Sequence, residues 1–224
     1  METITYERLP HIIEKQYAAE QAFLAEFEAG HYTLDNPLVK LNPYELSPLA
    51  AVILFELPAA SEATITVMGK EAAGNLSHTF PCATKHILPI YGLYPDYENT
   101  VEIVLGNGER STVKIQTEPL ADIVPLATKM ETTKEYMGDN MIFLTASMRS
   151  VPVGYDYKGD LRWYSNHNFA FDIKRMPNGH ILVGTERLVK MPYFTTGLYE
   201  MSFSGKVFKE YQSPIGGYHH DQFV

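Results

Sequence analysis

The sequence has little cysteine and no long apolar run. Cys82 is the only cysteine among the 224 residues, so a disulfide within this chain is excluded and the thiol is expected to be a small packed residue. No segment approaches the ~18 consecutive apolar residues of a transmembrane helix. Residues 1–30 also lack the basic start and apolar stretch of a secretory signal. As written, the chain is therefore expected to be cytoplasmic, with no membrane span.

Basic residues are scarce as well. Lys and Arg total 18 against 27 Asp and Glu, a net charge of −9, which argues against nucleic acid or an anionic membrane as the main partner. The sequence contains no Gly-rich phosphate-binding loop and no Gly-x-Ser-x-Gly elbow. The spacing of His31, His78, His86 and His167 matches no metal site. These patterns point to no nucleotide, metal or serine-hydrolase centre.

What is present is typical of a globular protein, with 45% hydrophobic and 20% charged residues, so disorder is not expected. A helix is predicted over residues 9–29, with Pro10 at its first turn and Gly30 as its C-terminal cap. Its expected apolar face consists of Ile13, Tyr17, Leu24 and Phe27. The helix should pack on the body of the protein or on a second subunit, which makes a homodimer possible.

From residue 36 the pattern changes to short strands. Apolar or alternating segments separated by Gly, Pro and Asn predict strands over residues 49–57, 63–68, 86–90, 101–105 and 112–117. Asn107-Gly108 supplies the turn between the last two. Strands without intervening helices predict a small antiparallel sandwich of the immunoglobulin or fibronectin type over residues 36–125.

The last part of the chain contains a faint internal repeat. Residues 203–207 are weakly similar in sequence to residues 157–161, and aligning Gly159 on Gly205 gives an offset of 205 − 159 = 46 residues. Each copy is expected to be strand, Gly turn, strand. A further hairpin over residues 169–184 is turned by Asn178-Gly179. Four strands in about 45 residues is the size of one β-propeller blade.

The sequence therefore predicts an all-β protein with three parts. Residues 1–35 hold the helix, residues 36–125 the sandwich, and residues 126–224 the first blade or blades of an incomplete β-propeller. Laying Asp221 on Asp172 places the last residues in the middle of a blade, and propellers have several blades. We therefore expect the chain to be the N-terminal part of a longer protein.

Two sets of motifs resemble the bacterial aryl-sulfate sulfotransferases. Residues 42–49 and 92–99 resemble the N-terminal sandwich domain of that family, and residues 155–164, 178–180 and 218–221 resemble its opening propeller blades. The resemblance implies transfer of a sulfuryl group from a phenolic sulfate ester to a phenol through a sulfohistidine. It also implies no cofactor, since the family uses neither a nucleotide sulfate donor nor a metal. The family is often exported to the periplasm and often dimeric.

The resemblance points to His219 and His220 as candidate catalytic residues. Neighbours in a strand face opposite sides, so only one of them can face a central channel. His220 is favoured, because the family's channel histidines tend to precede an Asp, here Asp221. It would bind sulfate oxygens or assist proton transfer, while the sulfuryl-accepting histidine is expected beyond Val224. The alternative is that the pair are hydrogen-bonded packing residues.

Three aromatic residues are candidate substrate-binding residues. Tyr94 and Tyr97 lie in a rigid loop that could stack on a phenyl ring, or that could pack the sandwich against the propeller. Phe171 could line an apolar channel entrance or belong to the core. His180, after the Asn-Gly turn, is expected to be an exposed strand-edge residue. A non-enzymatic propeller that binds a ligand or a protein is the competing functional class.

Overall fold

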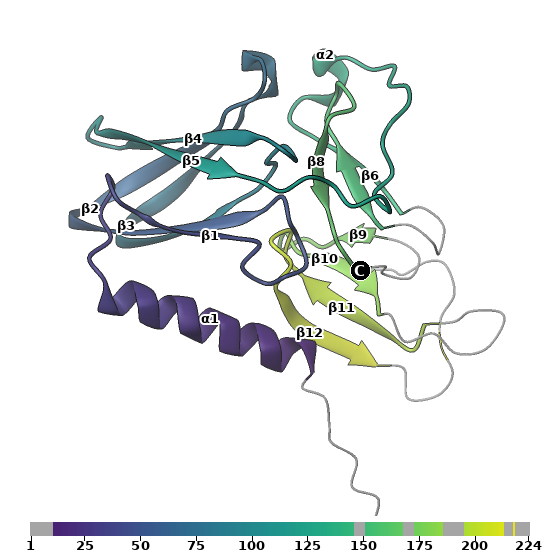
Figure 1. The fold of residues 1–224 in the computed structure, drawn as a ribbon, viewed down its shortest axis with the longest axis horizontal. Helices are drawn as coiled ribbons and strands as arrows, with labels where there is room; N and C mark the ends of the chain where they lie inside the picture. The colour runs from purple at the N-terminus through teal and green to yellow at the C-terminus, as the bar shows by residue number, and fades with distance from the viewer. Residues whose placement is uncertain (1–10, 146–150, 168–172, 186–194, 213–216, 218–224) are drawn as a thin grey trace, which may run out of the picture.

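The computed structural model describes residues 11–145, 151–167, 173–185, 195–212 and 217. One long helix accompanies twelve strands there, all of them paired antiparallel. Figure 1 shows the long-stranded sheet beside two short-stranded sheets, with α1 running along both parts. The predicted all-β fold with a leading helix is confirmed. No helix in the described ranges is long and apolar enough to cross a membrane.

The first part is a bent antiparallel sheet. Its strands are β1 (Leu38–Leu41), β2 (Ala51–Val67), β3 (Leu76–Ile90), β4 (Glu98–Leu105) and β5 (Arg110–Gln116). β2 and β3 form a long hairpin whose pairing is irregular between Glu56 and Ala63. β1 pairs with β2 before this irregularity and β4 pairs with β2 after it. The bend lets one sheet fold into two facing layers around an apolar core.

The strands predicted over residues 49–57 and 63–68 are one strand, which is a correction. Pro58 and Ala59, which follow the first predicted strand, lie exposed within β2 at the bend. Similarly, the strand predicted over residues 86–90 is the end of β3. Cys82, expected to be packed, is exposed on β3. The strand errors arose because local patterns do not reveal a strand that continues through a bend, whereas the expectation for Cys82 rested on residue type alone.

The unbroken apolar run in β2 is explained by burial on both faces. Ile53 and Phe55 point into the sandwich core, while Val52 and Leu54 pack against the apolar side of α1. Since neighbouring strand residues face opposite sides, both sets must be apolar when a helix covers the outer face.

Helix α1 (Ile12–Ala29) begins with a capping interaction and ends at Gly30. The backbone N–H of Ile13 donates to His11 Nδ1, and the N–H of His11 donates to the Glu14 carboxylate. The buried side chains are Gln16, Phe23 and Phe27. Tyr17, predicted to face inward, is 63% exposed. That prediction was wrong because the inward stripe includes a glutamine, which the apolar pattern cannot reveal.

The second part contains two antiparallel sheets of short strands. β6 (Ile142–Leu144), β7 (Val153–Tyr155) and β8 (Leu161–Tyr164) form one, and helix α2 (Lys134–Met137) precedes it. β9 (Ile173–Arg175), β10 (Ile181–Gly184), β11 (Gly197–Met201) and β12 (Val207–Gln212) pair in sequence order to form the other. The second has the strand count expected of a blade. That the two sheets surround a common axis stays a prediction.

The predicted repeat is a repeat of turn geometry. Gly159, Gly179 and Gly205 all have φ between +82° and +90°, the left-handed region that glycine adopts without strain. In each turn the glycine N–H donates to the carbonyl three residues earlier, at 2.9, 3.0 and 3.0 Å respectively. Gly205 is further constrained, because a Cβ there would lie 2.8 Å from that of Leu46.

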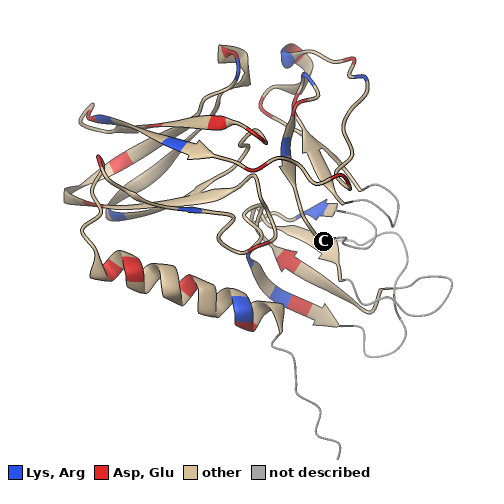
Figure 2. Cartoon of the chain, in the orientation of Figure 1, with Lys and Arg blue, Asp and Glu red and all other residues tan. Residues whose placement is uncertain are grey.

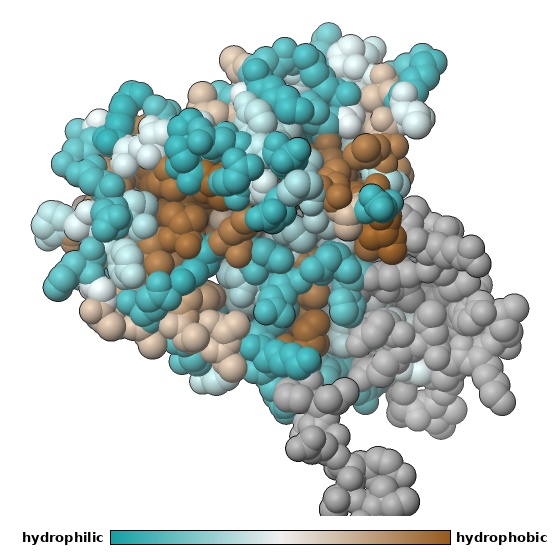
Figure 3. Space-filling model, viewed as in Figure 1, coloured by the Kyte–Doolittle hydropathy of each residue, from teal (hydrophilic) through white to brown (hydrophobic). Residues whose placement is uncertain are grey.

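Surface charges are mixed in sign. Figure 2 shows mostly Asp and Glu along α1, and charges of both signs on the strands. Apolar surface gathers in the part of Figure 3 where β6 lies; Ile142 and Leu144 of that strand are 39% and 51% exposed.

Gln16 joins α1 to the last hairpin. Its amide donates to the carbonyl oxygens of Tyr44 and Gly205 at 2.9 and 2.8 Å, and its oxygen accepts the N–H of Val207 at 2.8 Å. The side chain is buried. Beside it, the Lys206 ammonium pairs with Glu20 at 2.6 Å. The helix therefore packs on the body of its own chain, between the sandwich and the β11–β12 hairpin.

We predict that Gln16→Ala lowers the free energy of unfolding by about 2 kcal/mol, because buried backbone groups of Gly205 and Val207 lose their partners. Chemical denaturation measures the change. Gln21→Ala, at an exposed position of the same helix, is the control and should stay within ~0.5 kcal/mol of the wild type. Equal effects of the two substitutions would contradict this role of Gln16.

Candidate functional site

Three of the predicted site residues, His219, His220 and Phe171, lie outside the described residues. Their proposed roles therefore stay predictions. Tyr94 and Tyr97 are described, in the loop between β3 and β4.

Tyr94 lies buried where the sandwich meets β8. Its ring centroid is 4.0 Å from the guanidinium carbon of Arg162, and its hydroxyl accepts a hydrogen bond from Arg162 Nη1 at 2.9 Å. Tyr97 packs edge-on against it at 5.6 Å and is 39% exposed. Tyr94 thus lies between the sandwich and the second part of the chain, the position expected if the loop packs one against the other. Stacking of either ring on a substrate stays a prediction.

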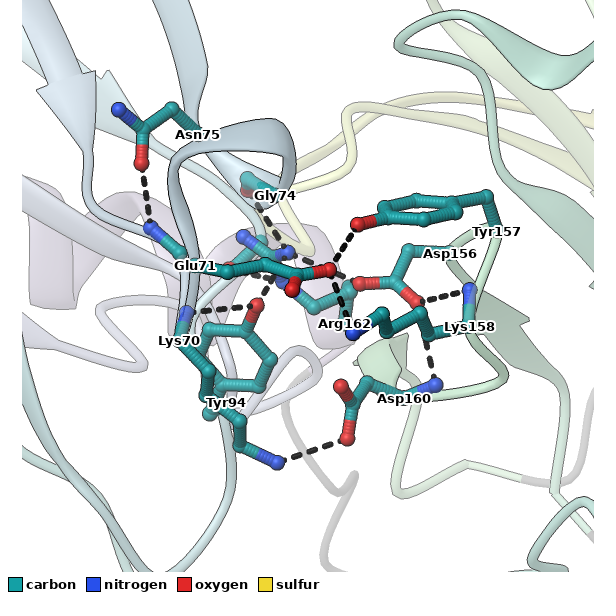
Figure 4. A network of polar contacts seen from close by, with 12 residues as sticks. Lys70, Glu71, Gly74, Asn75, Tyr94, Asp156, Tyr157, Lys158, Asp160 and Arg162 are labelled. Carbon is teal, nitrogen blue, oxygen red and sulfur yellow. Dashed lines mark hydrogen bonds and ion pairs between the residues drawn. The ribbon is translucent and has the colours of Figure 1, made fainter. Parts of the chain in front are cut away.

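Arg162 is the centre of this junction and is fully buried. Nε donates to the carbonyl of Gly92 at 2.7 Å, and Nη1 donates to the carbonyl of Gly74 and to Asp156 Oδ2, both at 3.1 Å. Figure 4 shows the guanidinium between two sandwich loops and the β7–β8 turn. Nη2 has no hydrogen-bond partner among the described residues. A single side chain thus fixes three segments to one another.

The rim of the junction carries ion pairs. Lys158 contacts Glu71 at 2.5 Å, the Tyr157 hydroxyl bonds to the same carboxylate, and Lys70 contacts Asp160 at 2.7 Å. Lys158 and then Tyr157 hold the pKa of Glu71 below its ordinary value. These groups are solvent-exposed, so each pair adds little to stability.

A cleft of about 800 Å³ lies among the described residues. Its walls come from β3, the segment before β6, the β9–β10 turn and the β11–β12 turn. Six Phe, Tyr and Trp side chains line it: Tyr44, Tyr91, Phe143, Trp163, Phe203 and Phe208. Elements distant in sequence therefore build one largely aromatic site.

The aromatic wall is ordered by ring contacts. Phe143 and Phe203 lie 5.5 and 5.7 Å from the Trp163 ring, both edge-on. The indole N–H donates to the Phe203 carbonyl at 2.8 Å, which fixes the orientation of the ring. Burial raises the pKa of the Tyr91 hydroxyl, so this wall is uncharged at neutral pH.

A histidine and a glutamate lie at the other side of the cleft. His180 lines it, and Nδ1 of its ring is 2.7 Å from Glu200 Oε1. The buried Glu200 carboxylate also accepts from Asn178 at 3.0 Å and from the Tyr211 hydroxyl at 2.7 Å. The hydroxyl of Tyr211, then His180, lower the pKa of Glu200 to about 2. An ionised carboxylate only accepts, so Nδ1 of His180 carries the proton.

His180 is more ordered than its sequence context indicates. Its ring stacks on Phe208 at 4.2 Å with an angle of 6° between the planes, and 26% of the side chain is exposed. The expected exposed strand-edge residue is therefore a positioned imidazole. The sequence feature that could have predicted this position is Glu200, an acidic residue in an otherwise apolar strand. A buried carboxylate requires a hydrogen-bond donor nearby, and His180 is one.

Within the described ranges, no three or more His, Cys, Asp or Glu side chains are grouped so that they could hold a metal ion.

Two family models match the chain. The arylsulfotransferase Ig-like domain matches residues 38–119, and the arylsulfotransferase (ASST) domain matches residues 126–224. The chain belongs to the arylsulfotransferase family. No curated protein matches its sequence.

Membership in the arylsulfotransferases confirms the resemblance found in the sequence motifs and the immunoglobulin-like character of the sandwich. It supports sulfotransferase function and phenolic substrates for the chain. The predicted domain limits, residues 1–35, 36–125 and 126–224, stay predictions.

We predict that Arg162→Met destabilises this arylsulfotransferase by about 3 kcal/mol, because Asp156 is left as an unpaired buried carboxylate. Adding Asp156→Asn should recover part of the loss, since both partners of the ion pair are then uncharged. Thermal and denaturant unfolding measure both. Arg110→Met, at a side chain 67% exposed, serves as the control. A double variant less stable than Arg162→Met would contradict the explanation.

Because folding lowers the pKa of Glu200, we predict that the free energy of unfolding depends on pH. The pKa of Glu200 falls from the ordinary 4.5 to about 2 on folding, so its contribution is complete above pH 4.5 and is lost as the pH falls towards 2. The loss caused by Glu200→Gln should therefore be largest above about pH 5 and shrink in acid. Unfolding curves between pH 2 and pH 7 test this, with Glu109→Gln, in an exposed turn, as control. A loss that does not vary with pH would oppose the assignment.

Proposed function

We propose that this protein transfers a sulfuryl group from a phenolic sulfate ester to an acceptor phenol through a sulfohistidine. The observation that carries the proposal is the ordered match of both arylsulfotransferase domains, over residues 38–119 and 126–224. The proposal uses no nucleotide sulfate donor and no metal, as the resemblance implies.

The chemistry suits histidine. A neutral imidazole nitrogen attacks sulfur, the bond from sulfur to the aryl oxygen breaks, and the departing phenolate takes a proton from an acid. The acceptor phenol then loses its proton to a base while its oxygen attacks sulfur, and the N–S bond breaks. Cations or N–H donors that contact the sulfuryl oxygens lower both barriers.

Within this chain we assign His220 the supporting role of binding sulfuryl oxygens or moving the phenol proton, with His219, its neighbour in the sequence, as the second candidate. The sulfuryl-accepting histidine is not assigned to this chain. Tyr97 is the better placed of the two loop tyrosines to contact a substrate, because its ring is partly exposed and that of Tyr94 is not. Phe171 is proposed to line the substrate entrance.

We predict that His220→Ala in the complete gene product lowers the rate of transfer from 4-nitrophenyl sulfate to phenol by about 100-fold, the scale of acid–base catalysis. Release of 4-nitrophenol, measured without added nucleotide, follows the reaction. His31→Ala, at an exposed position, should stay within about twofold.

A His220→Ala rate within about twofold of the wild type contradicts the assignment of His220. Absence of any transfer by the wild type contradicts the proposed reaction itself.

A further inference from the structure

His180 lines the cleft, and its Nε2 makes no hydrogen bond with any described residue. Nδ1 is occupied by Glu200 at 2.7 Å. In the neutral ring with a protonated Nδ1, Nε2 is a hydrogen-bond acceptor. The ring is held by its stack on Phe208 and by Glu200, so its position is fixed before any ligand arrives. This is the arrangement of an oriented base without a partner.

The cleft lined by His180 has room for a small aromatic molecule. Its volume of about 800 Å³ lies within the range of roughly 300–1,000 Å³ typical of small-molecule sites. Phe203 and Phe208 line it as aromatic rings able to contact a flat ligand. Ile87, on the sandwich side, also lines it and is 49% exposed.

The acceptor on His180, rather than the charges of the walls, favours an O–H donor as the ligand. Lys206 lines the cleft, but its ammonium is paired with Glu20 at 2.6 and 2.8 Å. Asp139 is likewise paired, with Lys134 at 2.6 Å, and Arg175 of β9 also lines the cleft. A lone pair on Nε2 attracts an O–H donor and repels sulfate oxygens.

We propose that this cleft binds a phenol whose hydroxyl group donates a hydrogen bond to Nε2 of His180 while its ring packs against Phe203 and Phe208. Glu200 is a positioning residue, which fixes the tautomer of His180. The choice of a phenol as the ligand rests on the proposed function; the position of the site rests on the cleft and on the His180–Glu200 pair.

The test compares 4-methylphenol with its methyl ether, which has the same ring and no O–H donor. Trp163 is the only tryptophan of this chain and lines the cleft, so its fluorescence reports binding, and calorimetry gives the dissociation constants. We expect the wild type to bind the phenol about fivefold more tightly than the ether, the scale of one net hydrogen bond. His180→Ala should remove that preference, and His180→Gln, which keeps an acceptor, should restore part of it. His78→Ala, exposed on β3, should bind as the wild type does.

If the wild type binds 4-methylphenol and its methyl ether equally well, or binds neither, the proposal is overturned. This outcome does not depend on any of the variants. Tighter binding of 4-methylphenyl sulfate than of 4-methylphenol also overturns the proposal, because the cleft is then an anion site. These titrations contain no sulfate donor together with an acceptor, so they are independent of turnover. Failure of the proposed function appears separately, as absence of transfer from 4-nitrophenyl sulfate.

Discussion

The burial of the Arg162 guanidinium is the constraint on which the arrangement of the two parts depends. A buried cation is costly unless it is paired and hydrogen-bonded, and the groups that satisfy it come from different segments: the carbonyls of Gly74 and Gly92, the Tyr94 hydroxyl and the Asp156 carboxylate. A shift of the sandwich relative to β8 removes several of these partners together. The main effect of the buried Arg162 guanidinium is therefore to specify how the sandwich lies relative to β8, and its contribution to the free energy of unfolding is secondary.

Helix α1 makes the second connection, far from the first in sequence. Gln16 bonds to the loop carbonyl of Tyr44 and to the hairpin backbone at Gly205 and Val207. The cleft lies between elements held by these connections, since its lining includes β3 on one side and both hairpin turns on the other. Its shape therefore follows from contacts within the chain, and a ligand would meet walls that are already in position.

The sequence was sufficient for several features that depend on neighbouring residues, although the helix begins at Ile12, after His11 as its N-terminal cap, and not at residue 9. The leading helix with its cap at Gly30, and the turns at Gly159, Gly179 and Gly205, follow from residue type and spacing. It was insufficient where a feature depends on distant partners. The inward position of Gln16 requires the hairpin it contacts, and the contact of Tyr94 with a buried arginine requires the sandwich to lie against β8. Pairing of His180 with Glu200 likewise depends on the register of β10 and β11.

The repeated turn shows how one backbone geometry serves different purposes. In all three turns the first residue donates its N–H to the carbonyl four residues later, at 3.0, 2.8 and 2.9 Å. The side chains differ: Asp156 in the first turn binds Arg162, the second places His180 at the cleft, and the third offers Gly205 and Lys206 to α1. In each turn a polar side chain also accepts a turn N–H: Asp156 from Lys158, Asn178 from His180 and Ser202 from Lys206. The backbone bonds and the glycine are common to all three turns, while the side chains that differ make the junction, cleft or helix contacts. A repeat of this kind therefore predicts where hairpins turn, and only the tertiary contacts decide which turn forms a binding site.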